Sequence, residues 1–209
     1  MPTSTWAIVV AAGSGERFGA RKQFLRLGYG RVVDWALRSA REHCAGVVLV
    51  VPADSLGEPE SLHPADVVVA GGSTRSASVR QGLAAVPPEA EVVVVHDGAR
   101  PVPVDGVWER VIEAVQSGAD AAVPVVPVTD TLREVGAGTV DRGRFVAVQT
   151  PQAFRARVLR AAHEGEPEGT DDASLVEAAG GKVVLVDGDV SNIKITTAVD
   201  LQVAELLCR

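Results

Sequence analysis

The stretch Ala11-Ala12-Gly13-Ser14-Gly15-Glu16-Arg17 directly follows the apolar run 7–10, which the pattern predicts to be a buried first strand. Its two glycines allow a tight turn and a close approach of the backbone to a ligand. Backbone N–H groups in such a turn can point at phosphate oxygens, and Arg17 and Lys22 add positive charge beside them. The stretch therefore predicts a loop that holds a nucleoside triphosphate at the end of a strand.

Two common glycine-rich loops do not fit this sequence. A P-loop requires the pattern G-x-x-x-x-G-K-[ST], which does not occur in the chain. The dinucleotide fingerprint G-x-G-x-x-G requires a third glycine at the position where Phe18 stands. Taken alone, the stretch is also compatible with a simple strand-to-loop turn, so the rest of the sequence has to decide.

The composition is that of a soluble globular protein and argues against two other classes. Hydrophobic residues make up 46% of the 209 positions, yet no apolar run is long enough to span a membrane. The formal net charge of −7 argues against a general nucleic-acid binder, which usually carries a basic excess. Cys44 and Cys208 lie far apart and are expected to be free thiols. Because the start lacks the features of a signal peptide, we expect a cytoplasmic protein.

Strand-like and helix-like segments alternate along the chain. The apolar runs expected to form strands after the first one are residues 46–51, 67–70, 92–95, 121–126 and 183–186. The segments expected to form helices are residues 32–43, 76–86, 107–116, 155–163, 172–179 and 198–207, with Thr170 and Asp171 at the start of the fifth. This alternation predicts an α/β fold, with a doubly wound, mostly parallel sheet in a single domain of residues 1–209.

Three loops should meet at one edge of this sheet. The glycine-rich turn Gly71-Gly72-Ser73-Thr74-Arg75 follows the run 67–70, and His96-Asp97-Gly98-Ala99-Arg100-Pro101 follows the run 92–95. In open α/β sheets, ligands bind outside the carboxyl ends of the strands. We therefore expect these two loops and the first glycine-rich stretch to form one binding site.

The pattern changes between residues 127 and 148. Residues 129–144 alternate β-type and turn residues around Gly136-Ala137-Gly138, which predicts a β-hairpin arm within the domain. A small arm of this kind buries little surface by itself. We therefore expect it to be a dimerisation arm that packs against a second copy of the chain in a homodimer.

A set of short motifs occurs in a fixed order along nearly the whole chain. The motifs are Ala11-Ala12-Gly13-x-Gly15-x-Arg17, Lys22-Gln23-Phe24-Leu25, Gly71-Gly72-x-x-Arg75-x-x-Ser78-Val79-x-x-Gly82-Leu83, residues 96–101, Asp130-Thr131, Thr150-Pro151-Gln152, Thr170-Asp171 and Asn192-Ile193-Lys194-Ile195-Thr196. In combination they closely resemble the 2-C-methyl-D-erythritol 4-phosphate cytidylyltransferase family. The resemblance implies a Rossmann-like nucleotidyltransferase fold.

The family's reaction is implied by this resemblance. The acceptor, 2-C-methyl-D-erythritol 4-phosphate, attacks the α-phosphorus of CTP through a phosphate oxygen, with Mg²⁺ on the triphosphate. The products are 4-diphosphocytidyl-2-C-methyl-D-erythritol and pyrophosphate, in non-mevalonate isoprenoid biosynthesis. Because a phosphate dianion is already a nucleophile, such chemistry needs positioning and charge neutralisation more than a general base. Two anions have to meet, so several cations should converge.

The resemblance also implies roles for individual residues. Residues expected to act in catalysis are Arg17, Lys22, Arg142 and Lys194. Residues expected to bind CTP are Ala11, Ala12, Gly13, Ser14, Gly15, Gly72, Ser78 and Asp97, and Asp97 is also a candidate magnesium ligand. Residues expected to bind the acceptor are Arg100, Thr131, Arg142 and Thr170. Thr131 and Arg142 belong to the arm, which in the family reaches into the neighbouring subunit's site.

The sequence departs from the family's pattern at three positions. Arg21 stands where a proline usually precedes the lysine, and Arg17 and Lys22 are closer together than usual. Arg21 is therefore a candidate to share the role expected of Arg17 and Lys22. Gly98 replaces a usual alanine. Ser191 stands where an acidic residue often precedes the Asn-Ile-Lys motif, which weakens any argument for a second carboxylate on magnesium.

Two alternative functions remain open at this stage. Ribitol-5-phosphate cytidylyltransferase is a sister enzyme with the same fold and mechanism and another polyol phosphate as acceptor. Thr131, Arg142 and Thr170 favour methylerythritol phosphate without deciding the question. A regulatory module that binds a nucleotide without catalysis would bind CTP and release no pyrophosphate.

Overall fold

A computed structural model describes residues 5–13, 15, 21–57 and 65–208. Two positions proposed from the sequence, Ser14 and Arg17, therefore lie outside the described residues. Within the described part of the chain, no helix is both long and apolar enough to cross a membrane. The two cysteines are free thiols, as expected.

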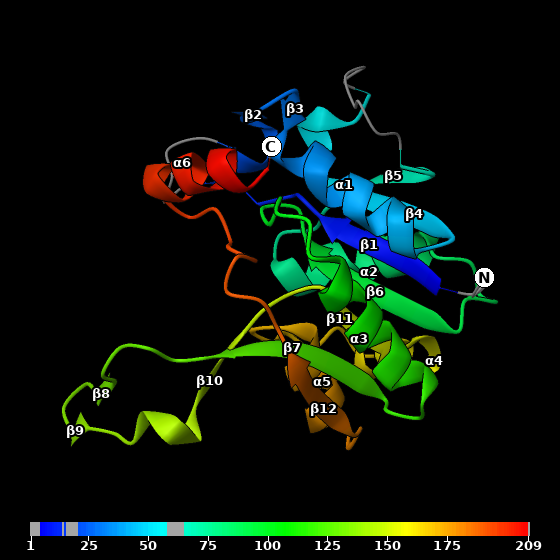
Figure 1. Ribbon diagram of the computed structural model, residues 1–209. Coiled ribbons are helices and arrows are strands. Elements are labelled where there is room, and N and C mark those ends of the chain that lie inside the picture. Colours follow the sequence, from blue (N-terminus) through cyan, green and yellow to red (C-terminus); the bar gives the residue numbers. More distant parts are fainter. Residues whose placement is uncertain (1–4, 14, 16–20, 58–64, 209) are drawn as a thin grey trace.

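The centre of the molecule is one eight-stranded sheet (Figure 1). Its strands are β1 (Thr5–Val10), β4 (Gly46–Val51), β5 (Val67–Ala70), β6 (Val92–Asp97), β7 (Ala121–Pro127), β10 (Val146–Val148), β11 (Gln152–Arg155) and β12 (Val183–Asp187). The order along the sheet is β10-β7-β11-β6-β1-β4-β5, and β12 pairs with β7. The pairs β6–β1, β1–β4, β4–β5 and β7–β12 are parallel, so the expected mostly parallel sheet is confirmed.

Strand β11 is a correction to the sequence analysis, which expected no strand between the arm at residues 127–148 and a helix that begins at residue 155. Residues 152–155 instead form an antiparallel strand between β6 and β7, and helix α4 begins at Ala156. The first three residues of this strand are buried, so the short segment carries no alternation of polar and apolar residues that would reveal a strand.

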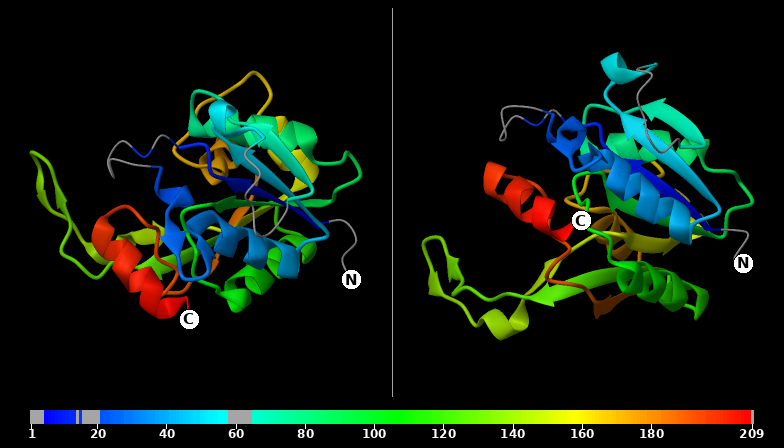
Figure 2. Two further views of the ribbon diagram at one scale, coloured as in Figure 1. Left: turned by 90° about the horizontal axis from the view of Figure 1, so that it is seen from above. Right: turned by 45° about the horizontal axis from the view of Figure 1, so that its top comes forward.

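Helices cover both faces of the sheet (Figure 2). On one face, α1 (Val32–His43) and α3 (Asp105–Gln116) pack on a core that includes Leu37 and Trp108. On the other face, α2 (Arg75–Ala85), α4 (Ala156–Ala162) and α5 (Asp172–Ala178) pack on a second core that includes Phe154. The last helix, α6 (Ala198–Leu207), closes a third, smaller cluster with residues of α1 and α3. The doubly wound arrangement is therefore confirmed.

Short elements fill the connections. They are the 3₁₀ helices η1 (Lys22–Phe24), η2 (Ala53–Ser55) and η3 (Arg142–Arg144), the hairpin β2 (Arg26–Leu27) with β3 (Gly30–Arg31), and the hairpin β8 (Arg133–Glu134) with β9 (Gly138–Thr139). The second hairpin confirms the antiparallel arm expected from the sequence.

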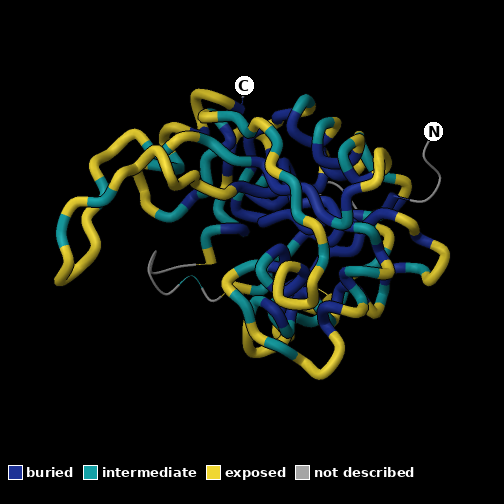
Figure 3. The backbone as a smooth tube through the Cα atoms, turned by 90° about the horizontal axis from the view of Figure 1, so that it is seen from below, coloured by how far each residue is buried: buried dark blue, intermediate teal, exposed yellow. Residues whose placement is uncertain are grey.

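The arm projects from the body of the molecule, and most of its residues are exposed (Figure 3). It presents apolar side chains to solvent, among them Val135, which is fully exposed, and Phe145, Val146 and Val148, which are 44–47% exposed. Helix α6 lies on the same side of the molecule as the arm (Figures 1 and 2). In a single copy of the chain, the apolar side chains on this side of the molecule therefore remain exposed to solvent.

The packing of α2 on the sheet generates a prediction about Gly82. A Cβ atom at this position would lie 2.5 Å from Cγ2 of Ile8 and 3.0 Å from Cγ2 of Val50. We expect Gly82→Ala to lower the free energy of unfolding by about 1–2 kcal/mol, because overpacking outweighs the gain in helix propensity. Urea denaturation measures this difference. The matched control is Gly106→Ala in α3, where the new atom meets only the flexible end of Arg110. A Gly82→Ala protein as stable as the wild type would contradict this close contact.

Candidate active site

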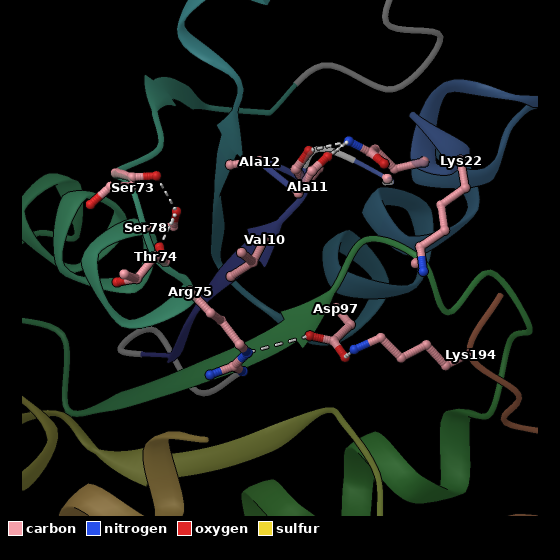
Figure 4. Close-up of a pocket in the computed structure, with 15 residues that line it drawn as sticks. Val10, Ala11, Ala12, Lys22, Ser73, Thr74, Arg75, Ser78, Asp97 and Lys194 are labelled. Atoms are coloured by element: carbon pink, nitrogen blue, oxygen red, sulfur yellow. Dashed lines mark hydrogen bonds and ion pairs between the residues drawn. The ribbon is translucent and has the colours of Figure 1, made fainter. Parts of the chain in front are cut away.

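A pocket of about 590 Å³ opens at the carboxyl ends of β1, β5 and β6. It is lined by the turn after β1, by η1, by the start of α2, by the loop after β6 and by the segment that precedes α6 (Figure 4). The three loops expected at one edge of the sheet therefore do meet there. The pocket lies within the size range of sites that hold small ligands.

The turn after β1 forms one wall, with Ala11, Ala12, Gly13 and Gly15 among the lining residues. Gln23 fixes its shape, because its Nε2 donates hydrogen bonds to the carbonyl oxygens of Ala11 (2.7 Å) and Gly13 (2.9 Å). In a trans peptide the N–H points away from the carbonyl, so the N–H of Ala12 is directed away from Gln23. Sequence reasoning quoted Gln23 within a motif without giving it this role.

The start of α2 forms a second wall through Gly72, Ser73, Thr74 and Ser78. Thr74 caps the helix by accepting a hydrogen bond from a backbone N–H, and Ser78 Oγ donates to the carbonyl oxygen of Thr74 (2.8 Å). The two walls touch at Gly71, where a Cβ atom would lie 2.3 Å from Cβ of Ala12. Glycine is therefore needed at position 71 for the two turns to approach each other.

Asp97, at the end of β6, is surrounded by three cations. Its Oδ2 accepts a hydrogen bond from Nζ of Lys194 at 2.6 Å, and Nε of Arg75 lies 3.8 Å from Oδ1. Nε of Arg100 lies 3.9 Å from Oδ2. Burial by itself would raise the pKa of Asp97, but the nearby cations, Lys194 foremost, lower this pKa to about 2. The carboxylate is therefore ionised throughout the neutral range.

Lys194 reaches the pocket on a segment that is held by the loop between β10 and β11 and by the loop after β6. Asn192 is fully buried, and its Nδ2 donates to the carbonyl oxygen of Thr150 (2.9 Å) and to Oε1 of Gln149 (3.3 Å). Arg100 Nη1 donates to the carbonyl oxygen of Asn192 (2.6 Å). These bonds bring a lysine that is 97 positions away in sequence onto Asp97.

Lys22 lines the same pocket from η1 and extends toward Asp97 and Lys194 (Figure 4). Its neighbour Arg21, considered as a residue that could share the work, is not among the lining residues. Nη2 of Arg21 is 2.7 Å from Oδ2 of Asp54, and Nη1 donates to Ser55 Oγ at 3.2 Å. Arg21 therefore contacts η2 and not the pocket.

The residues proposed for the acceptor are not brought into this chain's pocket. Arg100 is only 10% exposed and lies beneath Asp97, where it binds Asn192. Thr170 is exposed in the loop before α5 and does not line the pocket. Thr131 and Arg142 are exposed on the arm, where Arg142 donates to the carbonyl oxygen of Thr129. Arg75, in contrast, lines the pocket and was not among the site residues proposed from the sequence.

His96 lies beneath the site and links the loop to the sheet. Its Nε2 is 3.2 Å from the carbonyl oxygen of Arg100, and its Nδ1 is 3.2 Å from Oγ1 of Thr150. Thr150 in turn accepts a hydrogen bond from the backbone N–H of Asp97 (3.0 Å). Burial lowers the pKa of His96 to about 4, so the ring is neutral at physiological pH.

Comparisons with known proteins agree on one family. The model of the family IspD, 2-C-methyl-D-erythritol 4-phosphate cytidylyltransferase, matches residues 5–209. The chain is 44% identical to the enzyme of that name from Streptomyces coelicolor, over 98% of this chain and 84% of the relative. It is 41% identical to a bifunctional enzyme IspD/IspF from Nitratidesulfovibrio vulgaris, over 94% of this chain but only 56% of that longer protein. The crystal structure of the cytidylyltransferase from Thermus thermophilus matches with a TM-score of 0.83 and 39% identity, over 97% of this chain and 98% of that one.

The buried position of His96 predicts a pH dependence of stability. Its pKa falls from an ordinary value of 6.5 to about 4 on folding, so between these values only the unfolded chain binds the proton. The free energy of unfolding should therefore decrease as the pH is lowered through this range. Between pH 7 and pH 5 we expect the wild type to lose roughly 2 kcal/mol more than His96→Gln. Chemical denaturation at a series of pH values measures both slopes, and parallel curves for the two proteins would contradict the assignment.

Proposed function

The chain belongs to the 2-C-methyl-D-erythritol 4-phosphate cytidylyltransferase family, and we propose that the pocket at the carboxyl ends of β1, β5 and β6 is where it joins its two substrates. The enzyme transfers the cytidylyl group of CTP to 2-C-methyl-D-erythritol 4-phosphate. The observation that carries the assignment of the site is the convergence of Lys22 and Lys194 from distant parts of the chain on one cavity.

The proposed mechanism is direct transfer. A phosphate oxygen of the acceptor attacks the α-phosphorus of CTP, a new P–O bond forms, and the bond to the β-phosphate breaks so that pyrophosphate leaves. The chain's part is to hold the two anions together and to offset the negative charge that gathers in the transition state. Lys22 and Lys194 supply that charge. Arg17 is expected to join them and lies outside the described residues.

CTP is proposed to lie across the two walls of the pocket. The turn formed by Ala11, Ala12 and Gly13 would hold the triphosphate, since backbone N–H groups bind phosphate oxygens well. The base would lie against the α2 wall near Gly72 and Ser78, where backbone groups can read its polar edge. Asp97 would then face the ribose and the acceptor.

Magnesium is proposed as a component of the bound nucleotide. Among the residues that the structure describes, no group of three His, Cys, Asp or Glu side chains could hold a metal. Asp97 is the one acidic side chain among the described lining residues. That donor set fits an ion carried mainly by substrate phosphates with at most one protein carboxylate. When bound, the ion supplies further charge neutralisation on the triphosphate.

The arm is proposed to complete the site of a second copy in a homodimer. Its exposed apolar side chains need a covering surface, and a lone hairpin is marginally stable. Thr131 and Arg142 do not line the pocket of their own chain, which is consistent with a role in the pocket of another. Arg100 and Thr170 remain proposed contacts of the acceptor. The cytoplasmic location stays a prediction.

The first experiment compares lysine variants in a pyrophosphate-release assay with CTP and 2-C-methyl-D-erythritol 4-phosphate. We expect Lys22→Ala and Lys194→Ala each to lower kcat by about 100- to 1000-fold, because each removes a charge contact made in the transition state. The control is Lys182→Ala, which changes a lysine between α5 and β12, away from the pocket, and should leave turnover intact.

Near-normal turnover in both variants would contradict the assignment of the pocket. The same assay with ribitol 5-phosphate tests the sister activity, and faster turnover with that acceptor would replace the proposed substrate. Binding of CTP without pyrophosphate release with either acceptor would favour a regulatory module.

The arm proposal predicts complementation between two impaired variants. Arg142→Ala should raise the KM for the acceptor much more than the KM for CTP. Co-expressed with Lys194→Ala, it should form mixed dimers in which one pocket receives both changes and the other receives neither. Random pairing would then restore roughly a quarter of the sites. Arg133→Ala, on the same arm, is the control. A monomer in solution, or no recovery in verified mixed dimers, would overturn the proposal.

A further inference from the structure

A row of ion-paired and hydrogen-bonded side chains leads from the pocket into the helix layer behind it. Arg75 faces Asp97 in the pocket with Nε, and its Nη1 donates to Oδ2 of Asp172 at 2.7 Å. The other oxygen of Asp172 accepts from Nε2 of His163 at 3.1 Å. The row therefore runs from Lys194 through Asp97, Arg75 and Asp172 to His163, and only its first part borders the cavity.

Capping of α5 does not explain why Asp172 is buried. It is fully buried at the first residue of α5, yet the cap of that helix is Asp171, which accepts from the backbone N–H of Ser174 at 2.9 Å. The carboxylate of Asp172 instead faces α2, and His163 at the end of α4 holds it from behind. A buried carboxylate is costly unless it is paired and hydrogen-bonded, so both partners are needed.

Two carboxylates, those of Asp172 and Asp97, lie within 4 Å of the Arg75 guanidinium. It lies 2.7 Å from Asp172 but 3.8 Å from Asp97, so the nearer contact determines where the guanidinium sits. Burial alone would lower the pKa of Arg75, but Asp172 and Asp97 together raise it, so the guanidinium keeps its charge. Arg75 lies on the side of Oδ1 of Asp97, and Lys194 contacts the other oxygen, Oδ2, at 2.6 Å.

We propose that Arg75 is a positioning residue for the transfer reaction, fastened from behind by Asp172 and His163 so that Asp97 remains available to hold Lys194. Without Asp172, the guanidinium would close on Oδ1 of Asp97, its only remaining carboxylate within 4 Å among the described contacts. It would then share the charge of that carboxylate with Lys194 on Oδ2 and weaken the contact to the lysine. The inference rests on the roles proposed above for Asp97 and Lys194.

The principal test is Asp172→Asn, which removes the charge but keeps the shape at a position outside the pocket. We expect kcat to fall about 10- to 100-fold, by analogy with the loss of activity when the hydrogen-bond partners of metal ligands are removed. The KM for CTP should change by less than about twofold, because the contact affects the transition state more than nucleotide binding. Asp105→Asn, which removes an exposed carboxylate at the start of α3, is the matched control.

A double-mutant cycle separates positioning from a general structural role. If Asp172 acts through Arg75, Asp172→Asn should have little further effect on kcat in an Arg75→Gln background. Multiplicative losses in kcat would overturn the proposal, and so would an Asp172→Asn enzyme with wild-type turnover. The proposal would also be overturned if Asp172→Asn lowered the thermal stability of the protein and left kcat unchanged.

Two further variants cover the case in which Asp172→Asn does not fold. His163→Leu leaves Asp172 with one partner and should lower kcat by a smaller factor, whereas His163→Gln retains a donor and should restore most of the activity. Equal turnover of the two would contradict the proposal. If the wild type is active and Lys194→Ala is not, the assigned site is supported whatever the Asp172 and His163 variants show. Failure of this inference is therefore distinguishable from failure of the proposed site.

Discussion

The ionised carboxylate of Asp97 is the interaction on which the arrangement of the site depends. Lys194, Arg75 and Arg100 approach its oxygens from three separate segments of the chain. Without a negative charge between them, these cations would repel one another, and a guanidinium as buried as that of Arg100 would be left without a counter-ion. With Asp97 in place, positive groups are already gathered where we propose that the phosphates of the two substrates meet. Little reorganisation is then needed when the substrates arrive, which is how electrostatic catalysis is most effective.

Much of this architecture could be predicted from the sequence because it follows from local patterns. The boundaries expected for α1, β4, β5 and α6 agree with the structure, since each is a long periodic helix or a continuous apolar run. The rule that ligands bind at the carboxyl ends of parallel strands correctly brought the three loops together. Lys22, Asp97 and Lys194 therefore line one pocket as expected, although nothing in the spacing of Asp97 and Lys194 shows their contact.

What the sequence did not reveal depends on contacts across the fold. Strand β11 is too short and too buried to show a period, and only its pairing with β6 and β7 defines it. Arg75 and Asp172 are 97 positions apart, and each by itself resembles an ordinary helix-start residue. The sequence also did not show that Arg100 lies beneath Asp97, where its Nη1 donates to the carbonyl oxygen of the distant Asn192. Such tertiary pairings have no local signature.

The anchoring of Lys194 also has a consequence for how the protein is made. The segment that carries this lysine is held by Asn192, whose partners Gln149 and Thr150 were synthesised much earlier, and the segment is followed by the helix that closes the third core cluster. The central strands β1, β4, β5 and β6 all precede this lysine in the chain, so they are synthesised before it. A chain that stops before residue 194 could still contain the strands β1, β4, β5 and β6, but its pocket would lack this lysine.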